Sequence, residues 1–206
     1  MDGDRTSDYL TLESESRAVI REKMSKFIAI AFPIISADDA KTRIKKIAND
    51  YHDARHVCWA YVAGTNGDDW MANDNGEPSG TAGRPILGQI RSAGLTNVAV
   101  AVVRYFGGIK LGTSGLIEAY KEAARAAIAE GTKIIKTEET LLSISFNYAD
   151  MQPVMKLLKS FDGKIMNQNF EMICRLDYLI RKDKSEEITA RLSGIATVGE
   201  IGDVAG

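Results

Sequence analysis

The sequence is poor in the residue types that build most metal and redox sites. It has two cysteines and two histidines among 206 residues. Cys58 and Cys174 lie far apart, each in a strand-like apolar stretch, so the sequence predicts two buried free thiols rather than a disulfide or a metal pair. A closed zinc site needs four such ligands at short spacings. We therefore expect no metal and no cofactor.

Long apolar runs and an excess of charge are also missing. The longest apolar runs, such as residues 98–103, are far too short to span a bilayer, and the acidic N-terminus has no signal-peptide core. We therefore expect a cytoplasmic protein without a membrane partner. The formal net charge is −2, and neither half of the chain is basic. Any nucleic-acid contact must therefore come from a local patch.

Glycine, in contrast, is concentrated in two stretches. Residues 74–87 and 103–116 together hold seven of the 18 glycines. Glycine inside an ordinary element costs roughly 0.5–1 kcal/mol against alanine, so this density needs a reason. Each stretch leads directly into a helical pattern, where exposed N–H groups and the helix dipole favour a bound anion. The alternative is two tight loops that bind nothing.

The anion or RNA hypothesis names basic side chains and small residues in or near these stretches. Tyr105 and Phe106 offer aromatic surface for stacking on bases, although both also suit a core. The segment 111–115 is not a Walker A loop, because the terminal Gly-Lys-Ser/Thr is absent. The candidate contact residues are Arg55, Gly80, Thr81, Gly83, Arg84, Arg104, Gly107, Gly108, Lys110, Gly112, Thr113 and Ser114.

A second hypothesis, from a different class, is an enzyme. Asp53, His56, Asp74 and Glu77 are the right residue types for a metal or a general acid–base pair, but their spacing matches no known ligand motif. Serine and threonine residues also lie in the glycine-rich loops, and Cys58 lies close to His56. None of them has a nucleophile elbow or a placed His–Asp pair, so a covalent mechanism is disfavoured.

Hydrophobic periodicity predicts an α+β protein of two domains. Residues 1–15 are expected to form a flexible arm. In the domain at 16–131, strands are predicted at 18–22, 26–32, 57–63, 70–73 and 97–104, and helices at 37–51, 85–93 and 114–130. Residues 131–137 are the predicted domain boundary, with Gly131 as a helix C-cap. The domain at 138–204 is predicted to follow the ferredoxin-like order β-α-β-β-α-β.

Three motifs resemble those of a known family. They are Asp53-Ala-Arg-His56, Asp74-x-Gly-Glu-Pro-Ser-Gly-Thr-Ala-Gly83 and Val103-Arg-Tyr-Phe-Gly-Gly-x-Lys-Leu-Gly112. On these residues the chain resembles the IMPACT family, in particular its bacterial, YigZ-like members. The resemblance is strong over residues 16–131, and residues 137–203 resemble the small C-terminal domain of those bacterial members.

The resemblance implies a fold and a function. The N-terminal domain would be of the ribosomal-protein type, like domain IV of elongation factor G, with a left-handed βαβ crossover. The C-terminal domain would resemble domain V of the same factor. Eukaryotic family members are linked to translational control. We therefore expect a translation-linked regulatory or binding protein that contacts RNA or a ribosome-associated partner through a Gly-rich anion-binding surface. The alternative is a small-molecule enzyme, performing hydrolase or phosphate-ester chemistry with the four residues named above.

Overall fold

A computed structural model describes residues 7–204 of the chain. The chain divides into two compact units, each treated separately below. The N-terminal unit is Tyr9–Ile135. The C-terminal unit contains the described residues from Lys136 onward together with Ser7 and Asp8. Helices and strands are mixed in both units, which agrees with the predicted α+β class.

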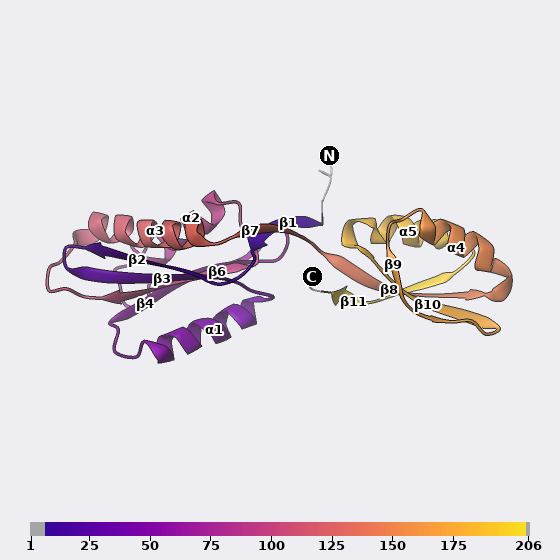
Figure 1. Cartoon of the computed structure of the whole chain (residues 1–206), viewed down its shortest axis with the longest axis horizontal. Helices are drawn as coiled ribbons and strands as arrows, with labels where there is room; N and C mark the ends of the chain where they lie inside the picture. The colour runs from indigo at the N-terminus through magenta and orange to yellow at the C-terminus, as the bar shows by residue number, and fades with distance from the viewer. Residues whose placement is uncertain (1–6, 205–206) are drawn as a thin grey trace. The chain divides into compact units, whose positions relative to one another are not determined.

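The N-terminal unit is built on a five-stranded sheet in the order β2-β3-β6-β4-β5, with antiparallel neighbours throughout. Figure 1 shows helix α1 on one face of the sheet and helices α2 and α3 on the other. The strands are β2 Ser16–Glu22, β3 Ser25–Pro33, β4 His56–Ala63, β5 Asp69–Asn73 and β6 Val98–Tyr105. The helices are α1 Ala37–Asp50, α2 Gly83–Ser92 and α3 Gly112–Glu130.

Strand β6 is the centre of this sheet, and its sequence explains why. Residues 98–103 are all buried. Side chains alternate between the sheet faces along a strand. Val98, Val100 and Val102 accordingly pack with α2 and α3, and the intervening residues pack with α1. The predicted central strand, covered on both faces, is therefore confirmed.

Two short strands were missed by the sequence reading. β1 (Asp8–Leu12) pairs with β7 (Lys133–Thr137), and Leu12 is completely buried. The predicted flexible arm is therefore wrong for residues 8–12; its residues 1–6 lie outside the described part of the chain.

The predicted boundary at 131–137 contains β7. Gly131 does follow α3, but its backbone is extended rather than left-handed. Glycine is favoured there because a Cβ would lie 2.9 Å from the side-chain ends of Leu12 and Ser16, which would have to shift.

The C-terminal unit has the predicted β-α-β-β-α-β order. Its four-stranded sheet has the order β11-β8-β10-β9. Helices α4 and α5 bury Val154, Leu158, Ile188 and Leu192 in a core shared with β8 and β10. The elements are β8 Glu139–Asn147, α4 Met151–Lys159, β9 Lys164–Asn169, β10 Ile173–Arg181, α5 Ser185–Leu192 and β11 Thr197–Val204.

The two cysteines and the apolar segments were also considered in the sequence. Cys58 and Cys174 are both buried and free, as expected. Within residues 7–204, no helix is long and apolar enough to cross a membrane.

Candidate functional site

The fold brings the two glycine-rich loops to the same end of the N-terminal sheet. Strands β5 and β6 both run antiparallel to β4, so they are parallel to each other and finish at one edge. The first loop, residues 74–82, follows β5 and leads into α2. The second loop, residues 106–111, follows β6 and leads into α3. Because each loop leads directly into its helix, α2 and α3 both begin beside this edge. Both helices lie on the same face of the sheet (Figure 1).

The first loop wraps around the carboxylate of Asp74. Its Oδ2 accepts the N–H of Gly80 at 2.7 Å, and its Oδ1 accepts those of Ala82 at 3.0 Å and Gly83 at 2.8 Å. Burial alone would raise the pKa of Asp74. The three N–H donors, aided by the positive charge of Arg84, outweigh burial and hold that pKa below its ordinary value. Asp74 therefore stays ionised and serves as the anion of its own loop.

This arrangement corrects the expectation for the start of α2. The N–H groups of Gly80 and Gly83, predicted to face an external anion, already donate to Asp74. The helix begins at Gly83, two residues before the expected start at Pro85. Thr81 is buried, and its hydroxyl donates to the Pro78 carbonyl at 2.6 Å. Of the candidates in this loop, these three residues stabilise the loop itself.

Glu77 connects the first loop to the sheet and to α3. Its side chain is 3% exposed, and its Oε1 lies 2.5 Å from Nη1 of Arg104. The same oxygen accepts the hydroxyl of Tyr120 at 2.8 Å. His56 Nε2 lies 3.9 Å from it, while Nδ1 of His56 lies 2.8 Å from the Asn75 carbonyl oxygen. One buried carboxylate thus ties together β4, β6, α3 and the loop.

Arg104, one of the candidate anion-contact residues, lies inside the fold. The residue is 5% exposed, and its charge is balanced by Glu77. Its guanidinium carbon lies 5.4 Å from the ring centre of Phe27 and 5.6 Å from that of Phe106. Nε of Arg104 has no hydrogen-bond partner among the described residues. Arg104 therefore fixes the end of β6 from the inside rather than presenting a surface cation.

The residues of the enzyme hypothesis are only partly brought together. His56 approaches Glu77, but the Asp74 carboxylate is enclosed by backbone donors, and Asp53 accepts a hydrogen bond from Tyr105 at 2.8 Å. No group of three or more His, Cys, Asp or Glu residues that could hold a metal occurs within residues 7–204. The predicted four-residue constellation is therefore not assembled in this structure.

Cys58 and Tyr120, which lie beside Glu77, are also poorly suited to act as a nucleophile or a base. Cys58 Sγ lies 3.0 Å from the Asp74 carbonyl oxygen and 3.3 Å from the Tyr120 hydroxyl. Burial raises the pKa of Cys58 to about 12, and burial likewise raises the pKa of Tyr120. Because the thiolate is the nucleophilic form, Cys58 is inert near neutral pH.

The second loop is pinned from one side only. A Cβ at Gly107 would lie 2.1 Å from the backbone carbon and oxygen of Met24, so only glycine allows this approach. The Gly107 N–H donates to the Ser25 hydroxyl at 3.3 Å. Gly108 and Gly112 have φ values of 90° and 74°, in the region that favours glycine. These glycines shape the loop and hold it against the turn between β2 and β3.

Beyond Gly112, the start of α3 remains open. Its N-cap residue, Leu111, makes no side-chain capping bond, and the first turn contains no acidic residue. Lys110, Thr113 and Ser114 are all exposed. Within the described part of the chain, Lys110 forms no ion pair. The first N–H groups of a helix have no partner inside it, so this end can accept an anion.

Apolar residues border this helix start. Phe106 and Ile109 in the second loop are 42% and 51% exposed, and Met24 in the neighbouring turn is 75% exposed. Lys23 and Met24 both have positive φ, which is costly for residues other than glycine. Sequence reasoning missed Met24 and Ile109, because single apolar residues in turns give no periodic signal. We call Met24, Phe106, Ile109, Lys110, Thr113 and Ser114 the α3 surface.

The chain is similar to known proteins in sequence. The Impact N-terminal domain model matches residues 23–128, a range that contains both loops. The IMPACT family member YigZ of Escherichia coli is 35% identical over 83% of this chain and 85% of its own length. An IMPACT family member of Haemophilus influenzae is 34% identical over 96% of this chain and all of its own length.

A solved structure agrees with these relatives. A crystal structure of a hypothetical protein is 31% identical, with a TM-score of 0.70, and the match covers 93% of this chain and 96% of that one. The likeness therefore extends over nearly the whole length of both chains. The chain belongs to the IMPACT family.

Proposed function

We propose that this protein is a translation-linked binding protein that contacts RNA through the α3 surface. The observation that carries the proposal is the open start of α3, which has no side-chain cap and is flanked by exposed Lys110, Thr113 and Ser114. Helix starts with a free positive end are suited to phosphate groups. Glu118, one turn further along α3, forms an ion pair with Lys121 at 3.6 Å.

The apolar border of the α3 surface supports RNA over a free phosphate. Phe106 is an exposed aromatic ring beside the proposed phosphate site, and aromatic rings stack on unpaired bases. Met24 and Ile109 extend the apolar area around it. A patch that combines a cation, helix N–H groups and an aromatic ring matches one nucleotide of a single strand. With a net charge of −2, binding depends on this local patch.

The other exposed candidate cations have secondary places in the proposal. Arg55 immediately precedes β4. The next residue, His56, pairs with Arg104 at the end of the sheet where the loops lie. Arg55 can therefore extend a basic surface from Lys110. Arg84 is exposed, but it lies at the helix start already occupied by Asp74. We therefore assign Arg84 less weight than Lys110.

Family membership supports the link to translation and a cytoplasmic location. The resemblance described above relates the N-terminal unit to domain IV of elongation factor G, including its left-handed crossover, and the C-terminal unit to domain V. Both remain part of the proposal. They favour a ribosome as the place where the RNA contact is made, and a ribosome-associated protein is the rival partner.

The test is binding to a short fluorescein-labelled oligouridine and co-sedimentation with ribosomes, for wild type, Lys110→Glu and Phe106→Ala. We expect both variants to lose oligouridine and ribosome binding while their circular dichroism stays unchanged. Ribosome binding that persists in both variants would point to a protein partner elsewhere. If neither RNA binds the wild type in a salt-sensitive manner, the proposal fails.

The enzyme alternative uses different residues, and the same assays distinguish it from the RNA-binding proposal. It needs His56 at the start of β4 and Glu77 in the first loop, whose Nε2 and Oε1 atoms are 3.9 Å apart. A His56→Gln variant should keep full RNA binding, because its side chain lies outside the α3 surface. If His56→Gln alone produced a cellular phenotype while the α3 variants did not, the hydrolase or phosphate-ester hypothesis would replace the binding one.

A further inference from the structure

The turn between β2 and β3 holds two large side chains where small residues are usual. Because Glu22 pairs with Ser25, Lys23 and Met24 form a two-residue hairpin loop. Their φ values are 43° and 69°, both positive as in a type I′ turn, for which Asn-Gly is the preferred pair. Positive φ costs free energy for a residue with a Cβ. Since both side chains are exposed, packing does not offset this cost, and a role in binding is indicated.

Two cations stand directly opposite each other beside this turn. Arg21 of β2 pairs with Lys26 of β3, so both side chains lie on one face of the hairpin. Lys26 also pairs with Tyr105, which packs with the core beneath α1, so this is the α1 face of the sheet. Like charges directly opposite each other destabilise a strand pair. Neither Arg21 nor Lys26 forms an ion pair within residues 7–204, so nothing described offsets their repulsion.

Two acidic residues of the described chain lie near this pair, and neither forms an ion pair with it. Glu22 is adjacent to Arg21, but side chains alternate along a strand, and its partner Ser25 is buried on the opposite face. Asp53 accepts the hydroxyl of Tyr105 at 2.8 Å. Residues 21–26 contain three cations and one acid, a net charge of +2 in a chain whose total is −2. We call Arg21, Lys23 and Lys26 the hairpin cations.

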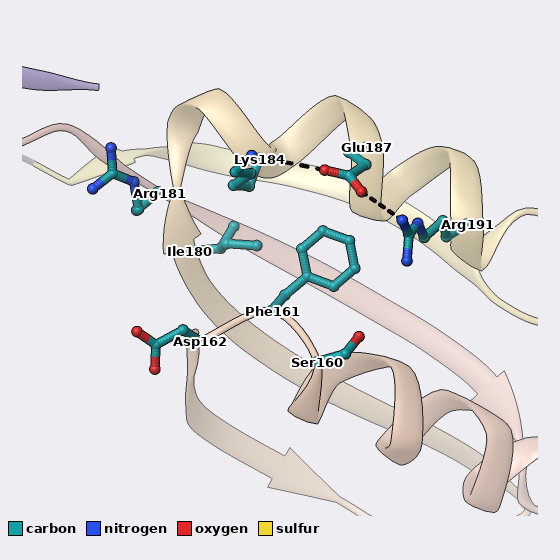
Figure 2. Close-up of a pocket in the computed structure, with 8 residues that line it drawn as sticks. All are labelled: Ser160, Phe161, Asp162, Ile180, Arg181, Lys184, Glu187 and Arg191. Carbon is teal, nitrogen blue, oxygen red and sulfur yellow. Dashed lines mark ion pairs between the residues drawn. The ribbon is translucent and has the colours of Figure 1, made fainter. Parts of the chain in front are cut away.

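The cations around the pocket of the C-terminal unit differ in this respect. Figure 2 shows Glu187 between Lys184 and Arg191, with its carboxylate 3.9 Å from the first and 2.8 Å from the second. Arg181, which also lines this pocket, forms an ion pair with Asp183 at 3.0 Å. These side chains have internal partners. The hairpin cations have none among the described residues and are therefore available to a ligand.

The turn connects the hairpin cations to the α3 surface. Met24 belongs to the α3 surface, and Gly107 of the second loop lies against its backbone. Lys23 is next to Met24 in the turn, and the Arg21–Lys26 pair follows on the α1 face. A chain of negative charges that leaves the start of α3 across this turn would therefore meet Lys23 first and the opposed pair next.

We propose that the hairpin cations bind the phosphodiester backbone of a single-stranded RNA, one nucleotide of which occupies the α3 surface. This inference rests on the proposed function and adds that the ligand is a single strand several nucleotides long. Arg21 can donate two charge-assisted hydrogen bonds to one phosphate, and Lys26 can add its charge to the same group. A phosphate between them would remove their repulsion. The path crosses from one face of the sheet to the other, and a double helix resists such a sharp bend.

The test uses length. The ¹⁵N-labelled full-length protein is titrated with a uridine dinucleotide and with octauridine, for wild type and for the double variant Arg21→Gln with Lys26→Gln. We expect the double variant to bind octauridine about tenfold more weakly, because charge-assisted contacts to the backbone are lost. Its log–log salt dependence should fall by about one unit. The dinucleotide, which reaches only the α3 surface, should bind both proteins equally.

The matched control is Lys45→Gln with Lys46→Gln, which removes the same charge from exposed positions on α1 and should leave octauridine binding unchanged. The inference is overturned if the hairpin variant binds octauridine like the wild type while Lys110→Glu still abolishes binding. Equal weakening of the dinucleotide, or equal weakening by the control, would also overturn it.

Two further outcomes separate this inference from the proposed function. If the hairpin variant loses ribosome co-sedimentation but keeps octauridine binding, the hairpin cations bind an acidic protein and the RNA inference is wrong. If the wild type binds neither oligouridine, the proposed function itself fails and the inference falls with it. Amide spectra that are unchanged outside residues 21–26 will show that the variant is folded.

Discussion

The two glycine-rich loops of the N-terminal unit look alike in sequence and end beside the same sheet edge, yet they are built differently. The first contains Asp74, whose carboxylate occupies the N–H groups at the start of α2. The second contains no acidic residue, and the start of α3 stays open beside Lys110. A glycine-rich loop before a helix therefore indicates an anion site, but the anion can be supplied by the chain itself. The position of one carboxylate decides between a structural and a binding loop.

The largest effect is expected where the first loop is anchored. Glu77→Gln should lower the free energy of unfolding by about 3–5 kcal/mol, because Arg104 would remain buried without its counter-charge. Urea denaturation measures this difference. The control is Glu118→Gln on the exposed face of α3, where a change below about 0.5 kcal/mol is expected. Equal effects of the two substitutions would contradict a structural role for the Glu77 network.

Asp74→Asn should have the next largest effect. It replaces a carboxylate that accepts three backbone N–H bonds, and we expect a loss of about 2 kcal/mol at pH 7. Asp68→Asn, an exposed carboxylate in the β4–β5 loop, is the control. A loss no larger than that of the control would mean that the first loop does not need its internal anion.

Comparison of the wild type with Asp74→Asn at different pH values gives a further test. The pKa of Asp74 is lowered in the folded state, so its contribution to stability is complete above the unfolded pKa, about 3.9. That contribution is lost as the pH falls through the lower folded-state pKa. The stability difference between wild type and Asp74→Asn should therefore be constant near neutral pH and shrink below about pH 4. A difference that instead changed between pH 6 and pH 8 would implicate another group.

A smaller effect is expected at the contact between the first loop and α3. Tyr120→Phe removes the hydroxyl that donates to Glu77 but keeps the ring, which packs edge-on against Phe27 at 5.1 Å. We expect a loss of about 1 kcal/mol, measured by thermal unfolding. A Tyr120→Phe protein as unstable as Glu77→Gln would show that the hydroxyl, rather than the Glu77–Arg104 ion pair, dominates the network.

The sequence predicts most of this fold but only part of this site. Amphipathic and alternating patterns locate α1, β6 and α3 within two residues, because burial on a fixed face leaves a periodic signal. Strands β1 and β7 were missed because each is short and is stabilised by a partner more than 100 residues away. Such pairing leaves no local pattern.

The site was predicted less well for a related reason. Residue type suggested that Arg104 and Asp74 face a ligand, yet both are used internally. Whether a charged side chain points outward or pairs inward depends on contacts between loops. The sequence gives the members of the site, and the fold decides that Lys110 is open while Arg104 is enclosed.

The most direct test of the difference between the loops compares two charge-neutralising variants in RNA binding. Lys110→Gln and Arg84→Gln each remove one exposed cation at the start of a helix, one at the open loop and one at the loop filled by Asp74. The measurement is the slope of log affinity for oligouridine against log salt concentration. We predict that Lys110→Gln reduces the slope by about one unit and that Arg84→Gln leaves it unchanged. Equal reductions, or a reduction with Arg84→Gln alone, would contradict the assignment of the open α3 start as the RNA-binding surface.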